Sequence, residues 1–284
     1  MKRFILLKRK RLLFYIAAFC LFLALIISLG YRELKMEKYE LDRAAVRKIH
    51  LSCSEYPYYT HTLSTREMNE SNLKYNCRYT KDMRIQKIPP SDIYSFVIEY
   101  NDGSTKTIKY SRLMNKYYDG ESRLIKPSRD FEAQLQKWMR ILDVHLYNKY
   151  GMLLPWEEVD KIFPRFSYAR IIDIYTGASF MVQRRAGTSH VDAQPLTAQD
   201  TAVMKKIFHG TWTWDRSGIV VQINQYRIAA SMNGKPHGSG KIKGNNFPGH
   251  FCIHFLNSTT HSGNLDQQHL VEILKAAGKL PLTE

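Results

Sequence analysis

The sequence predicts an α+β fold that consists of an N-terminal transmembrane helix, a small α+β module and a mostly β C-terminal domain. Three features lead to this prediction. An uncharged apolar run lies near the N-terminus, a hairpin pattern followed by a helical pattern occupies the middle, and alternating segments dominate the remainder. With 284 residues, of which 44% are hydrophobic, the chain is long enough for one or two packed domains besides the apolar run.

Residues 12–30 contain no charged side chain, and as a helix they would measure about 28 Å, close to the hydrocarbon thickness of a bilayer. The tail before them is basic, with Lys2, Arg3, Lys8, Arg9, Lys10 and Arg11. Because basic flanks stay in the cytoplasm, residues 1–31 are expected to anchor a single-pass plasma membrane protein whose bulk is extracytoplasmic. The alternative is a cleaved signal peptide that ends at Ser28-Leu29-Gly30. Residues 32–45, which mix both charges, are expected to form a linker.

The formal net charge is +16, which at first sight resembles that of a nucleic-acid-binding protein. Six of these charges belong to the N-terminal tail, so the rest of the chain carries about +10. This distribution favours an anionic neighbour such as a membrane surface or a wall polymer, and no nucleic-acid partner is expected. A basic face that is simply solvated is the alternative.

Residues 46–150 are expected to form the small α+β module. A strand is predicted at 48–53, and the segments 94–100 and 105–110 alternate on either side of Asp102-Gly103. Asp-Gly suits the positive φ angles of a tight turn, so these two segments predict a hairpin. Nothing in this module carries chemistry, and its expected role is to space, dock or sense.

A helix is predicted from Ser128, a suitable N-cap, to Gly151, a suitable stop. Its apolar residues recur at helical spacing and are expected to pack on the hairpin sheet; they are Phe131, Leu135, Trp138, Met139, Leu142 and Leu146. Residues 151–164, which contain two prolines, are expected to form the junction to the last domain.

Residues 165–284 are expected to form a catalytic domain that uses a cysteine. The predicted elements are hairpins at 169–175/179–184 and 218–224/226–232, a strand at 249–256, a helix from Thr197 with Asp200 in a capping box, and a helix from Asn264 or Asp266. Seven of the ten histidines in the chain lie in its last hundred residues.

The strand at 249–256 carries the first indication of chemistry. Its alternation predicts that His250, Cys252 and His254 share one face. The residues between them, Phe251 and Ile253, belong to the opposite, apolar face. An imidazole beside a thiol stabilises the thiolate and can carry its proton, so Cys252 is a candidate nucleophile.

The sequence Pro236-His237-Gly238, a Gly/Asn-rich loop and then Gly249-His250-Phe251-Cys252-Ile253-His254 resembles the signature of the L,D-transpeptidases. That family has His-Gly, a loop, and Ser/Thr-His-Gly-Cys-x-Arg/Asn. This chain departs from it at three positions. Gly249 replaces Ser/Thr, Phe251 replaces Gly, and His254 replaces Arg or Asn.

The resemblance covers about residues 218–277, and it implies a cysteine acyltransferase that acts on peptidoglycan stem peptides and needs no cofactor. Cys252 would be the nucleophile and His237 or His250 its base, with His254 as a further catalytic candidate. The candidates for substrate binding are Asn233, Gly238 and Gly249.

Two other interpretations remain open. In one, the chain is a zinc-dependent peptidase whose ligands come from His190, Asp192, His237, His250, Cys252 and His254. In the other, the site is inactive and the chain is a cell-wall-binding module.

The cysteine count suggests one disulfide. Cys20 lies in the apolar run, which leaves Cys53, Cys77 and Cys252. Outside the cytoplasm, an odd number favours a Cys53–Cys77 bridge, worth roughly 3 kcal/mol, and a free Cys252. The alternative is that Cys53 and Cys77 are two buried free thiols.

Overall fold

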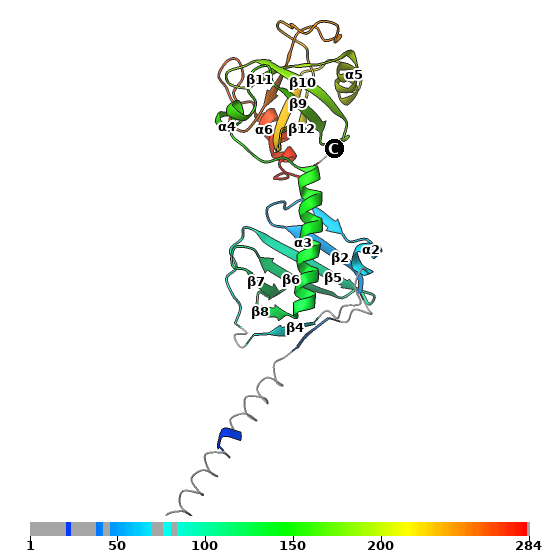
Figure 1. Ribbon diagram of the computed structural model, residues 1–284, viewed down its shortest axis with the longest axis vertical. Helices are drawn as coiled ribbons and strands as arrows, with labels where there is room; N and C mark the ends of the chain where they lie inside the picture. The colour runs from blue at the N-terminus through cyan, green and yellow to red at the C-terminus, as the bar shows by residue number, and fades with distance from the viewer. Residues whose placement is uncertain (1–20, 24–37, 42–45, 70–75, 81–83, 283–284) are drawn as a thin grey trace, which may run out of the picture. The chain divides into compact units, whose positions relative to one another are not determined.

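The structure is a computed structural model, and it describes residues 21–23, 38–41, 46–69, 76–80 and 84–282. The described chain is mostly β, with an eight-stranded sheet, a closed six-stranded barrel and few helices (Figure 1). The predicted α+β class is therefore wrong. Strands such as Lys116–Asp119 and Leu124–Pro127 are too short to show a clear alternation, yet they pair with neighbours and shift the balance towards sheet.

The transmembrane helix in the predicted fold class has no counterpart in the described chain. None of the helices found there is long and apolar enough to cross a membrane. The predicted segment 12–30 lies outside the described residues, apart from Leu21–Leu23. A short strand, β1, occupies Lys38–Glu40 inside the predicted linker and pairs with Asn76–Tyr79, so this part of the linker belongs to the sheet.

The eight-stranded sheet has the order β1-β4-β8-β7-β6-β5-β2-β3. Its further strands are β2 (Val46–Cys53), β3 (Thr60–Thr62), β4 (Asn76–Tyr79), β5 (Ile93–Tyr100), β6 (Thr105–Ser111), β7 (Lys116–Asp119) and β8 (Leu124–Pro127). The predicted hairpin is confirmed as β5 and β6, with Gly103 at φ 82° in the turn. The predicted helix is confirmed as α3 (Arg129–Lys149), and a short helix, α2, spans Thr65–Asn69.

The barrel closes in the order β10-β11-β14-β13-β12-β9. Its strands are β9 (Tyr168–Asp173), β10 (Ser179–Ala186), β11 (Val191–Pro195), β12 (Arg216–Ile223), β13 (Tyr226–Asn233) and β14 (Phe251–His254). Three helices accompany it: α4 (Trp156–Ile162), α5 (Ala198–Ile207) and α6 (Gln267–Ala276). Both predicted hairpins are confirmed, and so are the Thr197–Asp200 capping box and the Asp266 cap.

Local sequence explains the barrel interior. In β14, Phe251 and Ile253 are fully buried in the core, together with alternate residues of the other strands. The predicted alternation is thus confirmed, and Cys252 lies on the outer face of the barrel wall. Between β12 and β13 the chain turns through Asn224 at φ 50°, a conformation that asparagine tolerates better than most residues.

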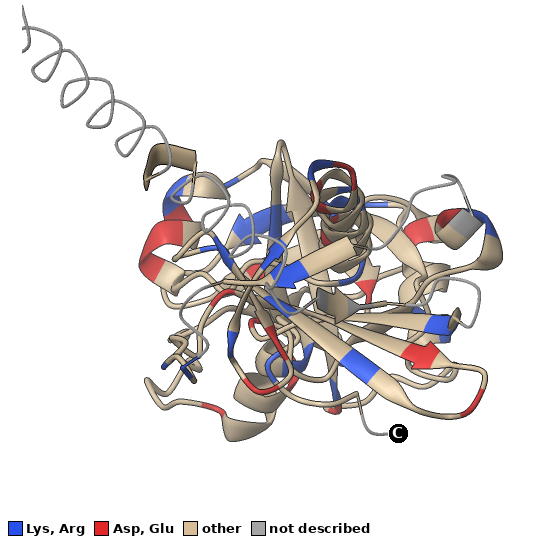
Figure 2. Ribbon diagram, turned by 90° about the horizontal axis from the view of Figure 1, so that it is seen from below, with Lys and Arg blue, Asp and Glu red and all other residues tan. Residues whose placement is uncertain are grey.

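The described chain divides into two compact units. The first unit holds most of the eight-stranded sheet, and the second holds the barrel together with residues 50–63, 90–95 and 136–149. Lysines and arginines are interspersed with acidic residues over the strands and helices (Figure 2). The expected anionic partner stays a prediction.

Cys53 and Cys77 are buried free thiols in this structure, so the predicted disulfide between them is absent. Cys53 lies on β2 and Cys77 on β4, and four strands stand between β2 and β4 in the sheet order. Side chains on strands so far apart cannot meet the short Cα separation that a disulfide requires. Burial raises the pKa of the Cys77 thiol to about 12, which keeps it protonated and unreactive.

Candidate functional site

Cys252 is held in the barrel wall between two strands. It pairs with Asp192 of β11 on one side. On the other side, its backbone N–H donates a 3.0 Å hydrogen bond to Oδ1 of Asn233 at the end of β13. The residue is only 5% exposed. The position of the sulfur is therefore fixed by main-chain pairing.

His237 and His250 are brought together by a small antiparallel bridge that precedes β14. The N–H of each residue donates to the carbonyl of the other, at 2.9 and 2.8 Å. The glycines next to them make this approach possible. A Cβ on Gly238 would lie 2.3 Å from Cε1 of His250, and one on Gly249 would lie 2.4 Å from the carbonyl oxygen of His237. Both glycines also have positive φ, so the His-Gly motif reflects a steric requirement.

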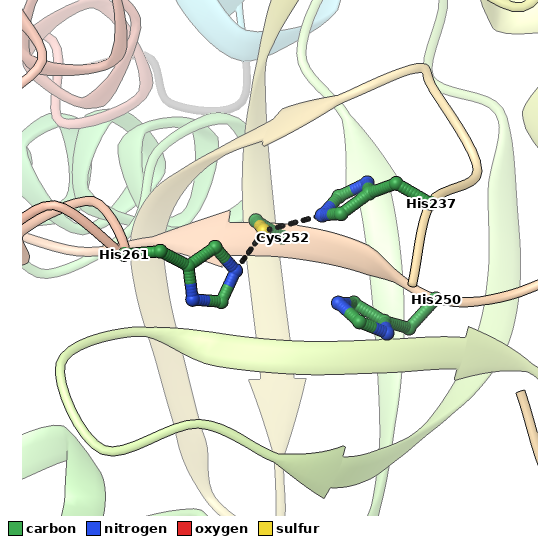
Figure 3. Close-up of side chains that lie close together, drawn as sticks. All are labelled: His237, His250, Cys252 and His261. Carbon is green, nitrogen blue, oxygen red and sulfur yellow. Dashed lines mark hydrogen bonds between the residues drawn. The ribbon is translucent and has the colours of Figure 1, made fainter. Parts of the chain in front are cut away.

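His237 forms the shortest contact to the thiol, with Nε2 3.3 Å from Sγ of Cys252 (Figure 3). Its Nδ1 lies 2.8 Å from the carbonyl oxygen of Lys235. A carbonyl only accepts, so Nδ1 carries the hydrogen and Nε2 presents its lone pair to the thiol. This arrangement suits a base that removes the thiol proton.

Two further imidazoles face the same sulfur (Figure 3). His250 donates from Nδ1 to the carbonyl of Ser239 at 3.1 Å, so its Nε2 also presents a lone pair. That Nε2 is buried and has no hydrogen-bond partner among the described residues. His261, in the loop after β14, places Nε2 3.9 Å from Sγ, and its side chain is 63% exposed. The sequence reasoning did not single out His261; its only signal was the high density of histidines.

Asp192 supplies the one carboxylate near the thiol among the described residues. Its Oδ1 lies 3.2 Å from Nε2 of His190, 3.7 Å from that of His250 and 4.0 Å from that of His261. Sγ of Cys252 is also 4.0 Å away. Burial alone would raise the pKa of the Asp192 carboxyl, but the close contact with His190 and the neighbouring imidazoles of His250 and His261 outweigh it and lower the pKa.

The thiol and its partner rest as a neutral pair. Burial, followed by the charge of Asp192, raises the pKa of the Cys252 thiol to about 12. Burial, followed by the neighbouring imidazoles His250 and His261, keeps the pKa of His237 below its usual value although the Lys235 carbonyl opposes this. If this sulfur acts as a nucleophile, its proton has to move to His237 during the attack and not before it.

His254 does not face the thiol. Its ring stacks between His190, with centroids 4.7 Å apart, and His269, with centroids 3.9 Å apart. His269 in turn bonds Oγ of Ser231 through Nδ1 at 2.9 Å. His254 is two residues along the strand from Cys252, where His269 of helix α6 covers it. The structure thus separates His254 from the other catalytic candidates.

The possible metal ligands that include Cys252 form two overlapping groups, and within each group the donor atoms lie within 4.8 Å of one another. One group contains His237, His250, Cys252 and His261, and the other contains His190, Asp192, Cys252 and His261. Five of the six expected ligands occur in these groups, and His254 does not.

A cavity of about 730 Å³ is lined by residues of β9, of β12 and of the segment that follows α5. The ring of Trp214 lies 4.9 Å from that of His237, and both sequence neighbours of this tryptophan, Thr213 and Asp215, line the cavity. The sequence pattern gave no indication of this space.

Comparison of the chain with family models, curated proteins and solved structures found no match. The fold and the site therefore define the class by geometry alone. It is a closed β-barrel protein that carries a buried thiol–imidazole pair on the outer face of its wall.

Proposed function

We propose that the protein is a cysteine-dependent acyltransferase that acts on peptidoglycan stem peptides, as its resemblance to the L,D-transpeptidases implies. The observation that supports this most is the 3.3 Å contact between Sγ of Cys252 and Nε2 of His237. The Lys235 carbonyl fixes the tautomer of that imidazole, so the three groups act as nucleophile, base and orienting group.

The reaction begins when the sulfur attacks an amide carbonyl carbon while its proton moves to Nε2 of His237. The carbon–nitrogen bond then breaks, and the leaving amine takes the proton from His237, which leaves a thioester on Cys252. An acceptor amine, or water, attacks the thioester and restores the thiol. By resemblance, the donor is a tetrapeptide stem that loses its terminal D-alanine.

Asn233 acts in this scheme as a positioning residue. Its Oδ1 accepts a hydrogen bond from the backbone N–H of Cys252. That N–H is therefore not available to stabilise the oxyanion of the tetrahedral intermediate. Gly238 and Gly249 allow the imidazoles of His237 and His250 to approach each other. Direct contact of Asn233, Gly238 and Gly249 with the substrate stays a prediction.

The test is covalent labelling by a carbapenem, an acylating inhibitor of the family that the chain resembles. Intact mass spectrometry should show one adduct on the full-length protein, and peptide mapping should place it on Cys252. Cys252→Ala should remove the adduct while circular dichroism shows retained structure. The buried thiols Cys53 and Cys77 remain in both proteins and serve as internal controls.

The proposed acyltransferase activity would be refuted if the wild-type protein took no label and also left isolated stem peptides unchanged. If it then bound wall material equally well with and without Cys252, a binding module would replace it. A label on Cys53 or Cys77 would likewise contradict the assignment of the nucleophile.

A further inference from the structure

The site contains more imidazoles than acyl transfer requires. One base is enough, yet Nε2 atoms of three histidines converge on a single sulfur (Figure 3). We propose that His237, His250, Cys252 and His261 bind a zinc ion, and that this ion masks the thiol until it is withdrawn. The binding follows from the ligand geometry, whereas the masking rests on the proposed function.

The donor atoms already approximate a zinc site. The four lie within 4.8 Å of one another, and two of the sulfur–nitrogen distances are 3.3 and 3.9 Å. With Zn–S of about 2.3 Å and Zn–N of about 2.0–2.1 Å, a tetrahedral site has edges of about 3.3–3.6 Å. The side chain of His261 is 63% exposed, and an inward rotation of this side chain would close the remaining gap.

Two of the three imidazoles are oriented as zinc ligands usually are. A metal-bound histidine commonly donates its other ring N–H to a carbonyl, which fixes the tautomer and the ring plane. His237 does so to Lys235 and His250 does so to Ser239. The buried Nε2 of His250 has no hydrogen-bond partner in the described part of the chain, and a metal would satisfy it.

Charge also favours the ion. On binding, the thiol loses its proton to solvent, and zinc loses its bound waters. One Zn–S bond and three Zn–N bonds form in their place. The thiolate and the nearby Asp192 carboxylate then balance the two positive charges. With zinc present, the high pKa of the buried Cys252 thiol no longer opposes the thiolate.

This site differs from that of a zinc peptidase. Four protein ligands fill a tetrahedral zinc ion, and such closed sites leave no position for a catalytic water. Zinc would therefore occupy the nucleophile and its base without performing chemistry of its own.

The first experiment measures binding to the metal-free full-length protein. Equilibrium dialysis against zinc chloride should give one ion per chain, and cobalt substitution should give a thiolate-to-cobalt charge-transfer band. Cys252→Ala should remove the band, and His261→Ala should weaken zinc binding at least tenfold. His209→Asn is the matched control, because His209 is exposed, lies outside the cluster and has a positive φ that asparagine tolerates. Unchanged affinity in His261→Ala, or a cobalt spectrum without the band, would overturn the site.

The second experiment separates masking from the proposed function. Alkylation of Cys252 by iodoacetamide should fall at least tenfold in saturating zinc and recover after chelation. The His261→Ala variant should lose most of this protection when its alkylation rate in zinc is compared with its own metal-free rate. If saturating zinc does not change carbapenem labelling, masking by zinc is refuted, but the proposed acyltransferase activity is not. If zinc protects Cys252 from iodoacetamide but carbapenem does not label the protein, the proposed acyltransferase activity is refuted, but the zinc site is not.

Discussion

Asn233 and Cys252 lie on neighbouring strands of the barrel, and Oδ1 of Asn233 accepts the backbone N–H of Cys252 at 3.0 Å. The side chain thus provides the acceptor for an N–H that is buried next to the last ladder pair between β13 and β14. A buried donor without a partner costs more than the bond itself contributes.

Asn233→Ala should therefore lower the free energy of unfolding by about 1–3 kcal/mol. Urea unfolding measures this value. The control is Asn264→Ala, which removes an exposed amide and should change stability by less than about 0.5 kcal/mol. Equal losses in both variants would show that the bond to Cys252 contributes nothing special.

Gly238→Ala should slow carbapenem labelling of Cys252. The new Cβ would collide with the ring of His250 and disturb its bridge to His237. Gly177→Ala is the matched control, because Gly177 also has a positive φ but its Cβ would meet nothing within 4 Å. In both variants the free energy of unfolding should fall by about 1–2 kcal/mol, because alanine is strained in the left-handed conformation. Only Gly238→Ala should lose labelling; the same rate in both would contradict the steric role.

His237→Ala should make alkylation of Cys252 strongly dependent on pH. Without the base, only the thiolate reacts, and the pKa of this thiol is about 12. The rate in the variant should rise about tenfold per pH unit between pH 7 and 9, because the thiolate fraction rises by that factor. The wild type should react faster at pH 7 and show a shallower slope. Parallel profiles would exclude His237 as the base.

His269 should make the protein less stable in mild acid. Burial, followed by the charge of Arg216, lowers its pKa to about 3, against the opposing effect of Asp266. Between pH 6.5 and 3 the unfolded chain therefore binds a proton that the folded chain does not, and the free energy of unfolding falls as pH falls. The loss is about 1.4 kcal/mol per pH unit, or about 2 kcal/mol at pH 5.

The measurement is urea unfolding at pH 5, 6 and 7 for the wild type and His269→Asn. Asparagine places an amide where Nδ1 bonds Ser231, and it cannot take up the proton. The neighbouring His254 remains in both proteins, and burial, the main cause of its lowered pKa, acts in both. A slope that is the same in both proteins would show that His269 titrates normally.

Local pattern was sufficient for the hairpins and for the two faces of the strand that carries Cys252, whereas His237 was paired with this cysteine only through the family resemblance. The alternation at 249–256 correctly separated the core residues from the outer face. The hairpins and the strand faces depend on neighbours in sequence, and so the sequence alone reveals them. The glycines next to His237 and His250 were predicted to bind substrate, and their steric role became evident only from the structure.

The rest depends on pairing between distant segments. Asp192 reaches the thiol only because β11 lies beside β14, and His261 only because the following loop folds back over that face. Closure of the barrel and the order of the eight-stranded sheet are likewise non-local. The Cys53–Cys77 bridge was predicted from a count of cysteines, which carries no information on strand order.

The four residues of β14 have a further consequence. The sulfur belongs to a strand bonded on both sides in a closed wall, whereas the imidazoles that face it come from loops before and after that strand. Changes in these loops can alter reactivity or metal affinity without rebuilding the core, while changes in β14 must preserve the wall. Sequence changes are therefore better tolerated in the loops that carry the imidazoles than in the strand that carries the thiol.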